Sequence, residues 1–212
     1  MRERGRFITF EGIDGSGKTT QLRLLAERLR AEGRDVFETA EPGGTEVGRQ
    51  IRRVLLDSAN QDLSPTTELL LYFASRAQNV EQSILPALDA GRIVLSDRFT
   101  DSTLAYQGYA RGLGAETVLT LDRIACKGLV PDLTLLIDLD LDLGIIRTRT
   151  RNAAGATIET RLDEESADFH RKVREAYLPI ARQHPNRFRI IDGRGTPQDV
   201  AAKVWKEVAA HV

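Results

Sequence analysis

The chain has 212 residues, of which 41% are hydrophobic, and its 30 basic and 31 acidic residues leave a formal net charge of −1. This length fits one globular domain, 1–212, and the charge balance excludes a global basic field that would attract nucleic acid. The charged N-terminus excludes a signal peptide, no apolar stretch is long enough to span a membrane, and the single cysteine, Cys126, excludes an intramolecular disulfide, so we expect a cytoplasmic protein.

Short apolar runs alternate with longer amphipathic stretches along the chain. The runs that predict buried strands are RFITFEG at 6–12, DVFETA at 35–40, RIVLSDRF at 92–99, PDLTLLIDLD at 131–140 and FRIIDG at 188–193. Helical stretches are predicted at 18–33, 46–57, 66–91, 143–151, 164–183 and from about 197. This order predicts an α/β fold: a five-stranded parallel sheet with helices on both faces. Ligands of such sheets bind at the carboxyl ends of the strands.

The segment after the first strand is a phosphate-binding loop. GIDGSGKT at 12–19 matches the G-x-x-x-x-G-K-[ST] pattern, between a strand and a helix as the pattern requires. Backbone amides of the loop and the start of the helix would hold a nucleoside triphosphate, Lys18 would reach its outer phosphates, and the Thr19 hydroxyl would bind Mg²⁺. The residues expected to bind the nucleotide are Gly12, Ile13, Asp14, Gly15, Ser16, Gly17, Lys18, Thr19 and Thr20.

Asp14 places a carboxylate in a loop that binds anions. Beside a triphosphate this charge is repelled unless a hydrogen-bond donor or a cation offsets it. The alternative is that its side chain points to solvent or caps a turn.

Several motifs together resemble the thymidylate kinases, P-loop enzymes that move a phosphoryl group from ATP to dTMP. The resemblance covers nearly the whole chain: FEGIDGSGKTTQ, EPGGT at 41–45, LYFASRAQNVEQSILPAL, DRFTDSTLAYQG at 97–108, PDLTLLIDLD, an arginine-rich segment and RLDEESADFHRKVREAYLPIA. It implies a three-layer P-loop kinase fold, ATP as phosphate donor with Mg²⁺, dTMP as acceptor, a step in dTTP synthesis and a homodimer. The apolar segment 66–88 would supply either the dimer interface or core.

The resemblance also implies how dTMP is bound. Tyr72 would stack on thymine and Arg76 would hydrogen-bond its edge, since residues four apart share a helix face. Pro42 would lie near the thymine methyl. Further contacts are implied from the carboxyl end of the third predicted strand and the segment after it: Ser102 and Thr103 at the base edge, Tyr106 beside the sugar, and Gln107 completing the pocket.

Charged residues at the strand ends complete the acceptor site. Arg98 is the candidate that grips the 5′-phosphate, with Arg52 as a helper, although Arg52 is equally consistent with a solvated helix face. Asp97 would organise Mg²⁺ through water or hold Arg98. The resemblance implies that Asp14 accepts a hydrogen bond from the 3′-hydroxyl of the acceptor.

The sequence RTRTR predicts a catalytic lid at about 147–161. Arg147, Arg149 and Arg151 would stabilise the transferred phosphoryl group, as in the thymidylate kinases whose catalytic arginine lies in the lid and not in the phosphate loop. The alternative is a solvated helix face. The chain departs from the family at Ala40, where arginine is common, and at Thr160, where aspartate is common.

Two other functions stay open at this point. One is a P-loop kinase for another nucleoside monophosphate or small molecule. The other is a nucleotide-dependent switch ATPase, but the sequence has no N-K-x-D signature for guanine. We expect Lys18, Asp14, Arg98 and the lid arginines to act in catalysis.

Overall fold

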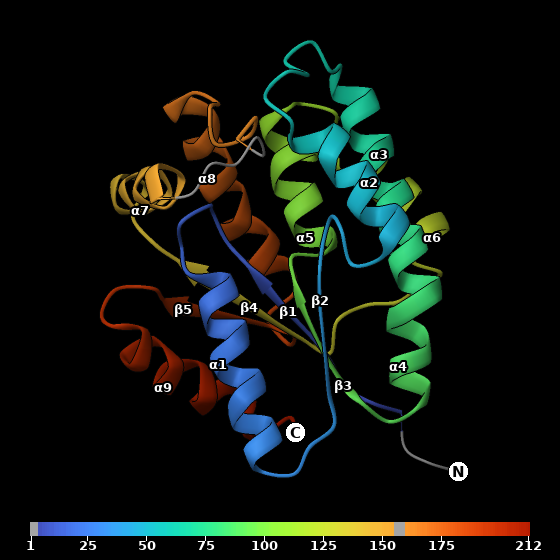
Figure 1. The fold of residues 1–212 in the computed structure, drawn as a ribbon, viewed down its shortest axis with the longest axis vertical. Helices are drawn as coiled ribbons and strands as arrows, with labels where there is room; N and C mark the ends of the chain where they lie inside the picture. Colours follow the sequence, from blue (N-terminus) through green and yellow to red (C-terminus); the bar gives the residue numbers. More distant parts are fainter. Residues whose placement is uncertain (1–3, 155–159) are drawn as a thin grey trace.

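The computed structural model describes residues 4–154 and 160–212. In these residues five strands form one parallel sheet in the order β2-β3-β1-β4-β5 (Figure 1). The strands are β1 (Phe7–Glu11), β2 (Val36–Ala40), β3 (Ile93–Asp97), β4 (Leu133–Asp138) and β5 (Phe188–Asp192). The predicted α/β class and the five predicted strands are confirmed.

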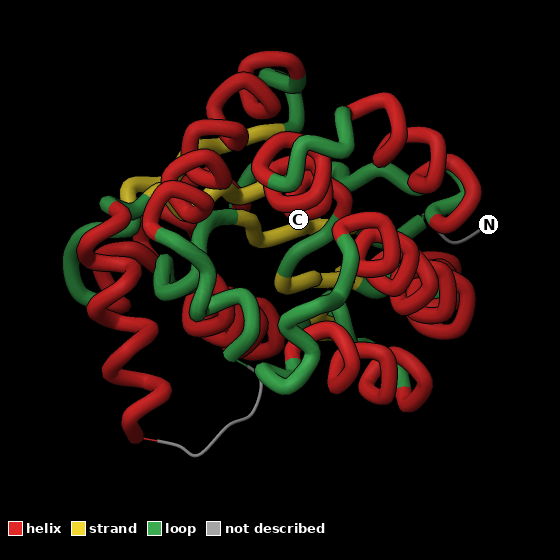
Figure 2. The backbone as a smooth tube through the Cα atoms, turned by 90° about the horizontal axis from the view of Figure 1, so that it is seen from above, coloured by secondary structure: helices red, strands yellow, loops and turns green. Residues whose placement is uncertain are grey.

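Helices cover both faces of the sheet, which is seen between them from above in Figure 2. One face carries α1 (Lys18–Ala31) and α9 (Pro197–Val208). The other carries α3 (Pro65–Asn79), α5 (Thr100–Thr103), α6 (Ala115–Ala125) and α8 (Ala167–Gln183). Helix α2 (Glu46–Leu56) packs on α3, and α7 (Leu141–Ala154) lies beside the phosphate-binding loop.

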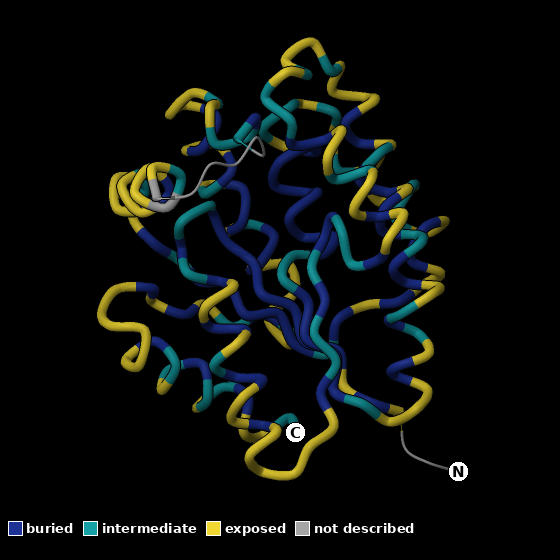
Figure 3. Tube along the Cα trace, viewed as in Figure 1, coloured by how far each residue is buried: buried dark blue, intermediate teal, exposed yellow. Residues whose placement is uncertain are grey.

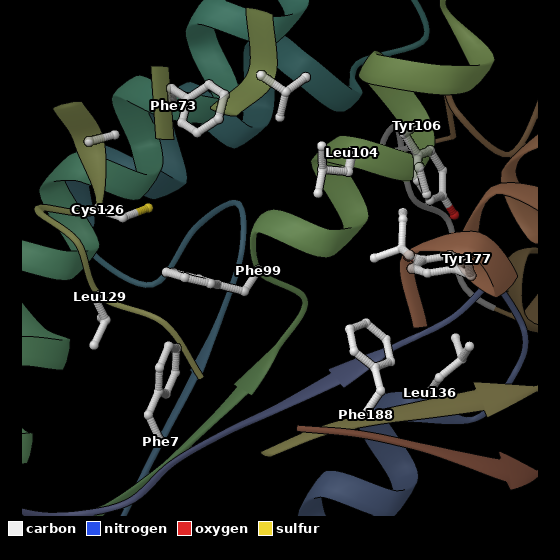
Figure 4. Packing of buried hydrophobic residues seen from close by; sticks show 14 of the residues in the cluster. Phe7, Phe73, Phe99, Leu104, Tyr106, Cys126, Leu129, Leu136, Tyr177 and Phe188 are labelled. Carbon is white, nitrogen blue, oxygen red and sulfur yellow. The ribbon is translucent and has the colours of Figure 1, made fainter. Parts of the chain in front are cut away.

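The alternation of side chains along the strands divides the core between these faces. Phe7 and Val94 are paired in register and point toward the α3 and α8 side, where Phe7 contacts Phe99 edge to face (Figure 4). Ile8 and Leu95, one residue further, point toward α1 and α9. Both sets are buried, so the strands form the dark interior of Figure 3.

The structure divides the helical stretch predicted at 66–91. Helix α3 is followed by the π-helical turn η1 (Val80–Ile84) and then by α4 (Leu85–Asp89). Pro86 lies in the first turn of α4 and has no amide hydrogen to donate, which favours the wider turn before it. Most of this segment is core: Leu69, Phe73, Val80 and Ile84 are buried.

Two further helical segments follow β3. Residues of DRFTDSTLAYQG form α5 and the π-helical η2 (Leu104–Ala110). Helix α6 lies in a segment to which the sequence patterns assign no element. Among the described residues, no helix combines the length and the apolar character needed to cross a membrane.

Candidate active site

The phosphate-binding loop joins β1 to α1 at the carboxyl edge of the sheet. Gly12, Gly15 and Gly17 have φ of 136°, 76° and 99°, a backbone conformation that glycine adopts without strain. Buried Lys18 donates to the carbonyl oxygen of Ile13 at 2.8 Å and so lies along the inside of the loop. The amides of such a loop converge on one point, and they can hold phosphate oxygens there.

A cleft of about 930 Å³ runs along this loop and across the ends of β2 and β3. Many of the predicted site residues line it: Asp14, Gly15, Ser16, Gly17, Lys18, Thr19, Thr20, Pro42, Arg52, Asp97, Arg98 and Arg147. The structure therefore brings the loop, the EPGGT segment, the end of β3 and α7 to one continuous site.

Asp14 has the partners that its position requires. Its carboxylate accepts hydrogen bonds from Arg98 Nη2 at 2.6 Å and from the Tyr106 hydroxyl at 2.9 Å. Burial alone would raise the pKa of Asp14, but the charges of Arg98 and Lys18 and the Tyr106 hydrogen bond hold it well below its usual range. Asp14 is therefore an anion at neutral pH and does not point freely to solvent.

Arg98 is the centre of the hydrogen-bond network at the end of β3. Its guanidinium bonds the carbonyl oxygen of Gly12 at 3.0 Å, Ser102 Oγ at 3.0 Å and Tyr106 OH at 3.1 Å, besides Asp14. Its φ is 73°, which is uncommon for a residue with a side chain. This conformation turns the side chain from the strand end back toward the phosphate-binding loop.

Lys18 and Thr19 begin α1. Burial and the charge of Arg98 lower the pKa of Lys18 to about 8, against the attraction of Asp14 and Asp97. The Thr19 hydroxyl donates a short hydrogen bond to Asp97 Oδ2. A hydroxyl and a carboxylate thus meet where the loop joins the helix.

Arg76 of α3 is buried, 1% exposed, and is held by two neighbours. Its Nε bonds Glu41 Oε2 at 2.5 Å, and its Nη2 bonds Thr103 Oγ1 at 2.9 Å. Its Nη1 has no hydrogen-bond partner among the described residues. Arg52 Nη1 donates to the carbonyl oxygen of Pro42 at 3.0 Å, which places Arg52 inward and not on a fully solvated face.

The remaining predicted nucleobase residues are buried near the cleft but do not line it in the described structure. Tyr72 packs with Leu55 and Leu56. Gln107 donates to Glu68 Oε1 at 2.8 Å. Glu68 also accepts from Arg111 Nη2 at 3.1 Å and from Arg161 Nη2 at 2.7 Å. Arg161, at the end of the predicted lid, is therefore an anchored residue with 3% exposure.

Helix α7 carries the arginine-rich segment and packs directly on the phosphate-binding loop. A Cβ atom on Gly15 would lie 2.2 Å from the Gly144 carbonyl oxygen, so both positions are too close for larger side chains. Arg147 lines the cleft, and Arg149 is exposed. The side chain of Arg151 and residues 155–159 of the predicted lid lie outside the described structure.

Several residues of the cleft were not predicted from the sequence. Gly193, Gly195, Pro197 and Val200, from the turn after β5 and the start of α9, line it, and so do Arg49 and Arg53 of α2. The rule that ligands bind at strand ends could have indicated the turn after β5. The arginines of α2 carry no motif that separates them from a solvated face.

Known proteins are similar to this chain over nearly its whole length. The family profile described as thymidylate kinase matches residues 10–204. The chain is 51% identical to a thymidylate kinase of Pelobacter propionicus, covering 96% of this chain and 94% of the relative. It is 52% identical to one of Caldanaerobacter subterraneus, covering 99% and 97%.

A solved structure gives the same result for the fold. The crystal structure of thymidylate kinase from Ehrlichia chaffeensis superposes with a TM-score of 0.78 and 34% identity, covering 97% of this chain and 99% of that one. Family profile, relatives and fold together show that the chain belongs to the thymidylate kinase family.

Proposed function

We propose that this enzyme moves the terminal phosphoryl group of ATP to the 5′-phosphate of dTMP in the cleft between the phosphate-binding loop and Arg98. Phosphorylation of dTMP is the activity of its family, and ATP is the phosphate donor. The observation that carries the assignment of the site is the continuity of the cleft from Lys18 to Arg98 and Arg52. Two anionic substrates can meet there end to end, which is the geometry that phosphoryl transfer needs.

ATP lies on the phosphate-binding loop. The loop amides and Lys18 bind its phosphates, and residues 14–20 line this half of the site. Pro197 and Val200 give the donor end of the cleft an apolar surface on which a flat adenine ring can pack.

dTMP lies on the Arg98 side. Arg98 binds the 5′-phosphate with a planar fork of donors, and Arg52 assists it from α2. Asp14 accepts from the sugar hydroxyl. The base lies toward Pro42, Tyr72, Arg76, Thr103 and Gln107, and the sugar lies beside Tyr106. The unpartnered Nη1 of Arg76 is a donor available to a base carbonyl.

The donor set at the start of α1 fits Mg²⁺. Thr19 and Asp97 contribute a hydroxyl and a carboxylate oxygen that already lie in contact, and Mg²⁺ prefers oxygen ligands and keeps positions for water and phosphate. Bound there with ATP, Mg²⁺ would neutralise charge on the phosphates.

The lid about 147–161 closes over the transferred group. Arg147 already lines the cleft, and Arg149 and Arg151 follow it on α7. Their charges offset the negative charge of the transition state, and closure keeps water from hydrolysing ATP. Lys18 acts from the opposite side, so the moving group is held between cations without a covalent intermediate.

A coupled ADP-release assay over a panel of monophosphates tests this function. We expect strong turnover with dTMP, less with dUMP and little with ribonucleotides. The discrimination against dUMP should be partial, since the one methyl group that it lacks contributes only about 1–3 kcal/mol in an apolar pocket. Arg98→Ala should raise the KM for dTMP, whereas Lys18→Ala should abolish transfer. Equal rates with CMP or AMP, or ADP release without an acceptor, would contradict the proposal.

The enzyme acts as a cytoplasmic homodimer with no nucleic-acid or membrane partner. The balanced charge and the apolar residues exposed on neighbouring helices α2 and α3 support this: Val47 is 47%, Val54 is 45% and Leu70 is 50% exposed.

A further inference from the structure

Glu11 ends β1, immediately before the phosphate-binding loop, and is fully buried. Its Oε1 accepts from the amide of Phe99 at 2.8 Å. Its Oε2 accepts from the hydroxyls of Ser102, in a short bond, and of Tyr177, at 3.2 Å. The transfer chemistry described above does not use this carboxylate.

The same two hydroxyls also face Arg98. Ser102 Oγ lies 3.0 Å and Tyr177 OH 3.5 Å from Arg98 Nη1, and the two hydroxyl oxygens are 2.9 Å apart. In Figure 4 the hydroxyl of Tyr106, which also accepts from Arg98, points toward the Tyr177 side chain of α8. A hydroxyl can turn its proton either way, whereas an ionised carboxylate can only accept. Glu11 therefore draws the hydroxyl protons to itself and leaves oxygen lone pairs for the guanidinium.

Glu11 also fixes the backbone of Arg98. The Phe99 amide that it binds belongs to the next residue, and the Arg98 amide donates to the carbonyl oxygen of Phe10 at 2.9 Å. On the carbonyl side of Arg98, Ser96 Oγ donates at 2.7 Å. These bonds hold the left-handed conformation, with φ of 73°, that aims the side chain at the cleft.

We propose that Glu11 is a positioning residue for the acceptor: through Ser102 and Tyr177, and through the Phe99 amide, it sets the direction of the Arg98 guanidinium. The inference rests on the proposed function, in which Arg98 binds the 5′-phosphate of dTMP. It also assigns the Ser102 hydroxyl to the support of Arg98 and not to the base edge, because the partners of that hydroxyl are Glu11, Arg98 and Tyr177.

The role requires the ionised form of Glu11, which is the main form in alkaline buffer. Burial and the nearby Asp101 carboxylate raise the pKa of Glu11 to about 7, against the Ser102 hydrogen bond, the Arg98 charge and the Phe99 amide. The carboxylate is thus mostly ionised well above neutral pH.

Glu11→Gln is the sharpest variant, because it keeps the volume and replaces one acceptor oxygen with an NH₂ donor. If the amide oxygen stays on Phe99, the NH₂ faces Ser102 and Tyr177 and turns their protons toward Arg98. We expect the KM for dTMP to rise about tenfold, with the KM for ATP within about twofold of the parent enzyme.

Tyr177→Phe and Ser102→Ala carry the same test if Glu11→Gln does not fold. Each should raise the KM for dTMP about threefold. In the double variant Glu11→Gln with Tyr177→Phe, the rise in the KM for dTMP should be smaller than the product of the two single rises. Thr9→Val is the matched control. It removes a buried hydroxyl from the same strand, and this hydroxyl bonds Thr134 and not Arg98. It should lower the unfolding temperature and leave the KM for dTMP unchanged.

Arg98→Ala separates this inference from the proposed function. If Arg98→Ala leaves the KM for dTMP unchanged, the acceptor assignment itself is wrong. If Arg98→Ala raises it and the Glu11, Tyr177 and Ser102 variants do not, the inference alone is overturned. An equal rise in both KM values, or a fall in kcat alone, also overturns it, because a general structural role would give that result.

Discussion

Asp14 shows how one side chain can belong to both substrates. It lies in the phosphate-binding loop, yet its partners are Arg98 and Tyr106, which lie on the side that we propose for the acceptor. The repulsion that a carboxylate should feel beside a triphosphate is offset by these contacts. In the proposed function, the loop is therefore shared by the two substrate sites.

We expect Asp14→Asn to raise the KM for dTMP about tenfold and to change the KM for ATP less, because the amide cannot form the ion pair with Arg98. Initial-rate kinetics with each substrate varied would measure this. A larger rise in the KM for ATP than in the KM for dTMP would show that Asp14 acts on the phosphate donor and not on the acceptor.

The same variant should change the acid stability of the protein. The pKa of Asp14 is lower in the folded chain than its ordinary value of 3.8, so its ionised form stabilises the fold above that value, and this contribution is lost as the pH falls below it. The difference in free energy of unfolding between the parent and Asp14→Asn should therefore shrink as the pH is lowered from about 5 to 3, as measured by urea denaturation.

At the scale of elements, α7 is positioned by its contact with the phosphate-binding loop. A Cβ atom on Gly144 would lie 2.9 Å from the Asp14 carbonyl oxygen and 3.0 Å from Ile13 Cδ1. Any side chain there moves the helix that carries Arg147. The close approach of α7 to the phosphate-binding loop therefore depends on the absence of a side chain at Gly144 and at Gly15.

We expect Gly144→Ala to lower kcat about tenfold, since small displacements of charged groups have large effects on transfer. Ile146→Ala, on the same helix at a residue 58% exposed, should leave kcat near the parent value. Steady-state kinetics with saturating substrates would compare them. Equal activity of both variants would show that α7 tolerates the shift.

Glu68 joins three separate segments in a buried ion cluster. It is fully buried in α3 and pairs with Arg111 after η2 and with Arg161 at the end of the lid segment. Arg161 Nε also donates to the carbonyl oxygen of Leu55 at 2.5 Å, which ties the same segment to α2.

Glu68→Gln should lower the free energy of unfolding by about 3 kcal/mol, because it leaves the buried Arg161 guanidinium without its counter-charge, whereas Arg111 keeps its ion pair with Glu165. Glu81→Gln, which removes an exposed pair with Lys127, should change it by less than about 1 kcal/mol. Urea unfolding at constant pH would measure both. A small effect at Glu68 would mean that water reaches the arginines.

The whole molecule exposes apolar side chains on α2 and α3, and we expect this face to pair with a second copy. Light scattering should give twice the 23.6 kDa of one chain. Leu70→Glu, at a residue 50% exposed, should shift the mass toward one chain, because it places charge in the apolar contact. A parent mass of one chain at micromolar concentration would contradict the dimer.

The parts of this molecule that depend on local pattern were predictable. The five strands, the loop at 12–19 and the shared helix of Tyr72 and Arg76 follow from periodicity and motif. The division at Pro86 and helix α6 were not predicted, because an apolar run does not distinguish one helix from a helix interrupted by a π turn.

The support of the site was less predictable than its members. Glu11 and Gly144 act through residues 88 and 129 positions away, Phe99 and Gly15, so no spacing in the sequence indicates them. No spacing in the sequence indicates that Gln107 and Arg161 both bond Glu68 either. Motifs indicated the side chains that we propose for the chemistry, whereas the contacts that orient those side chains appear only in three dimensions.

The ion pair between Asp14 and Arg98 gives the resting enzyme a built-in counter-ion. Asp14 already orders the Arg98 side chain in the free enzyme. An arriving phosphate therefore replaces the carboxylate on Arg98 without a further loss of side-chain entropy at the arginine. Because Asp14 stays in the loop after this exchange, its carboxylate is then available to accept from the sugar hydroxyl of the acceptor. The free site therefore already holds Arg98 in the orientation in which it would bind the phosphate.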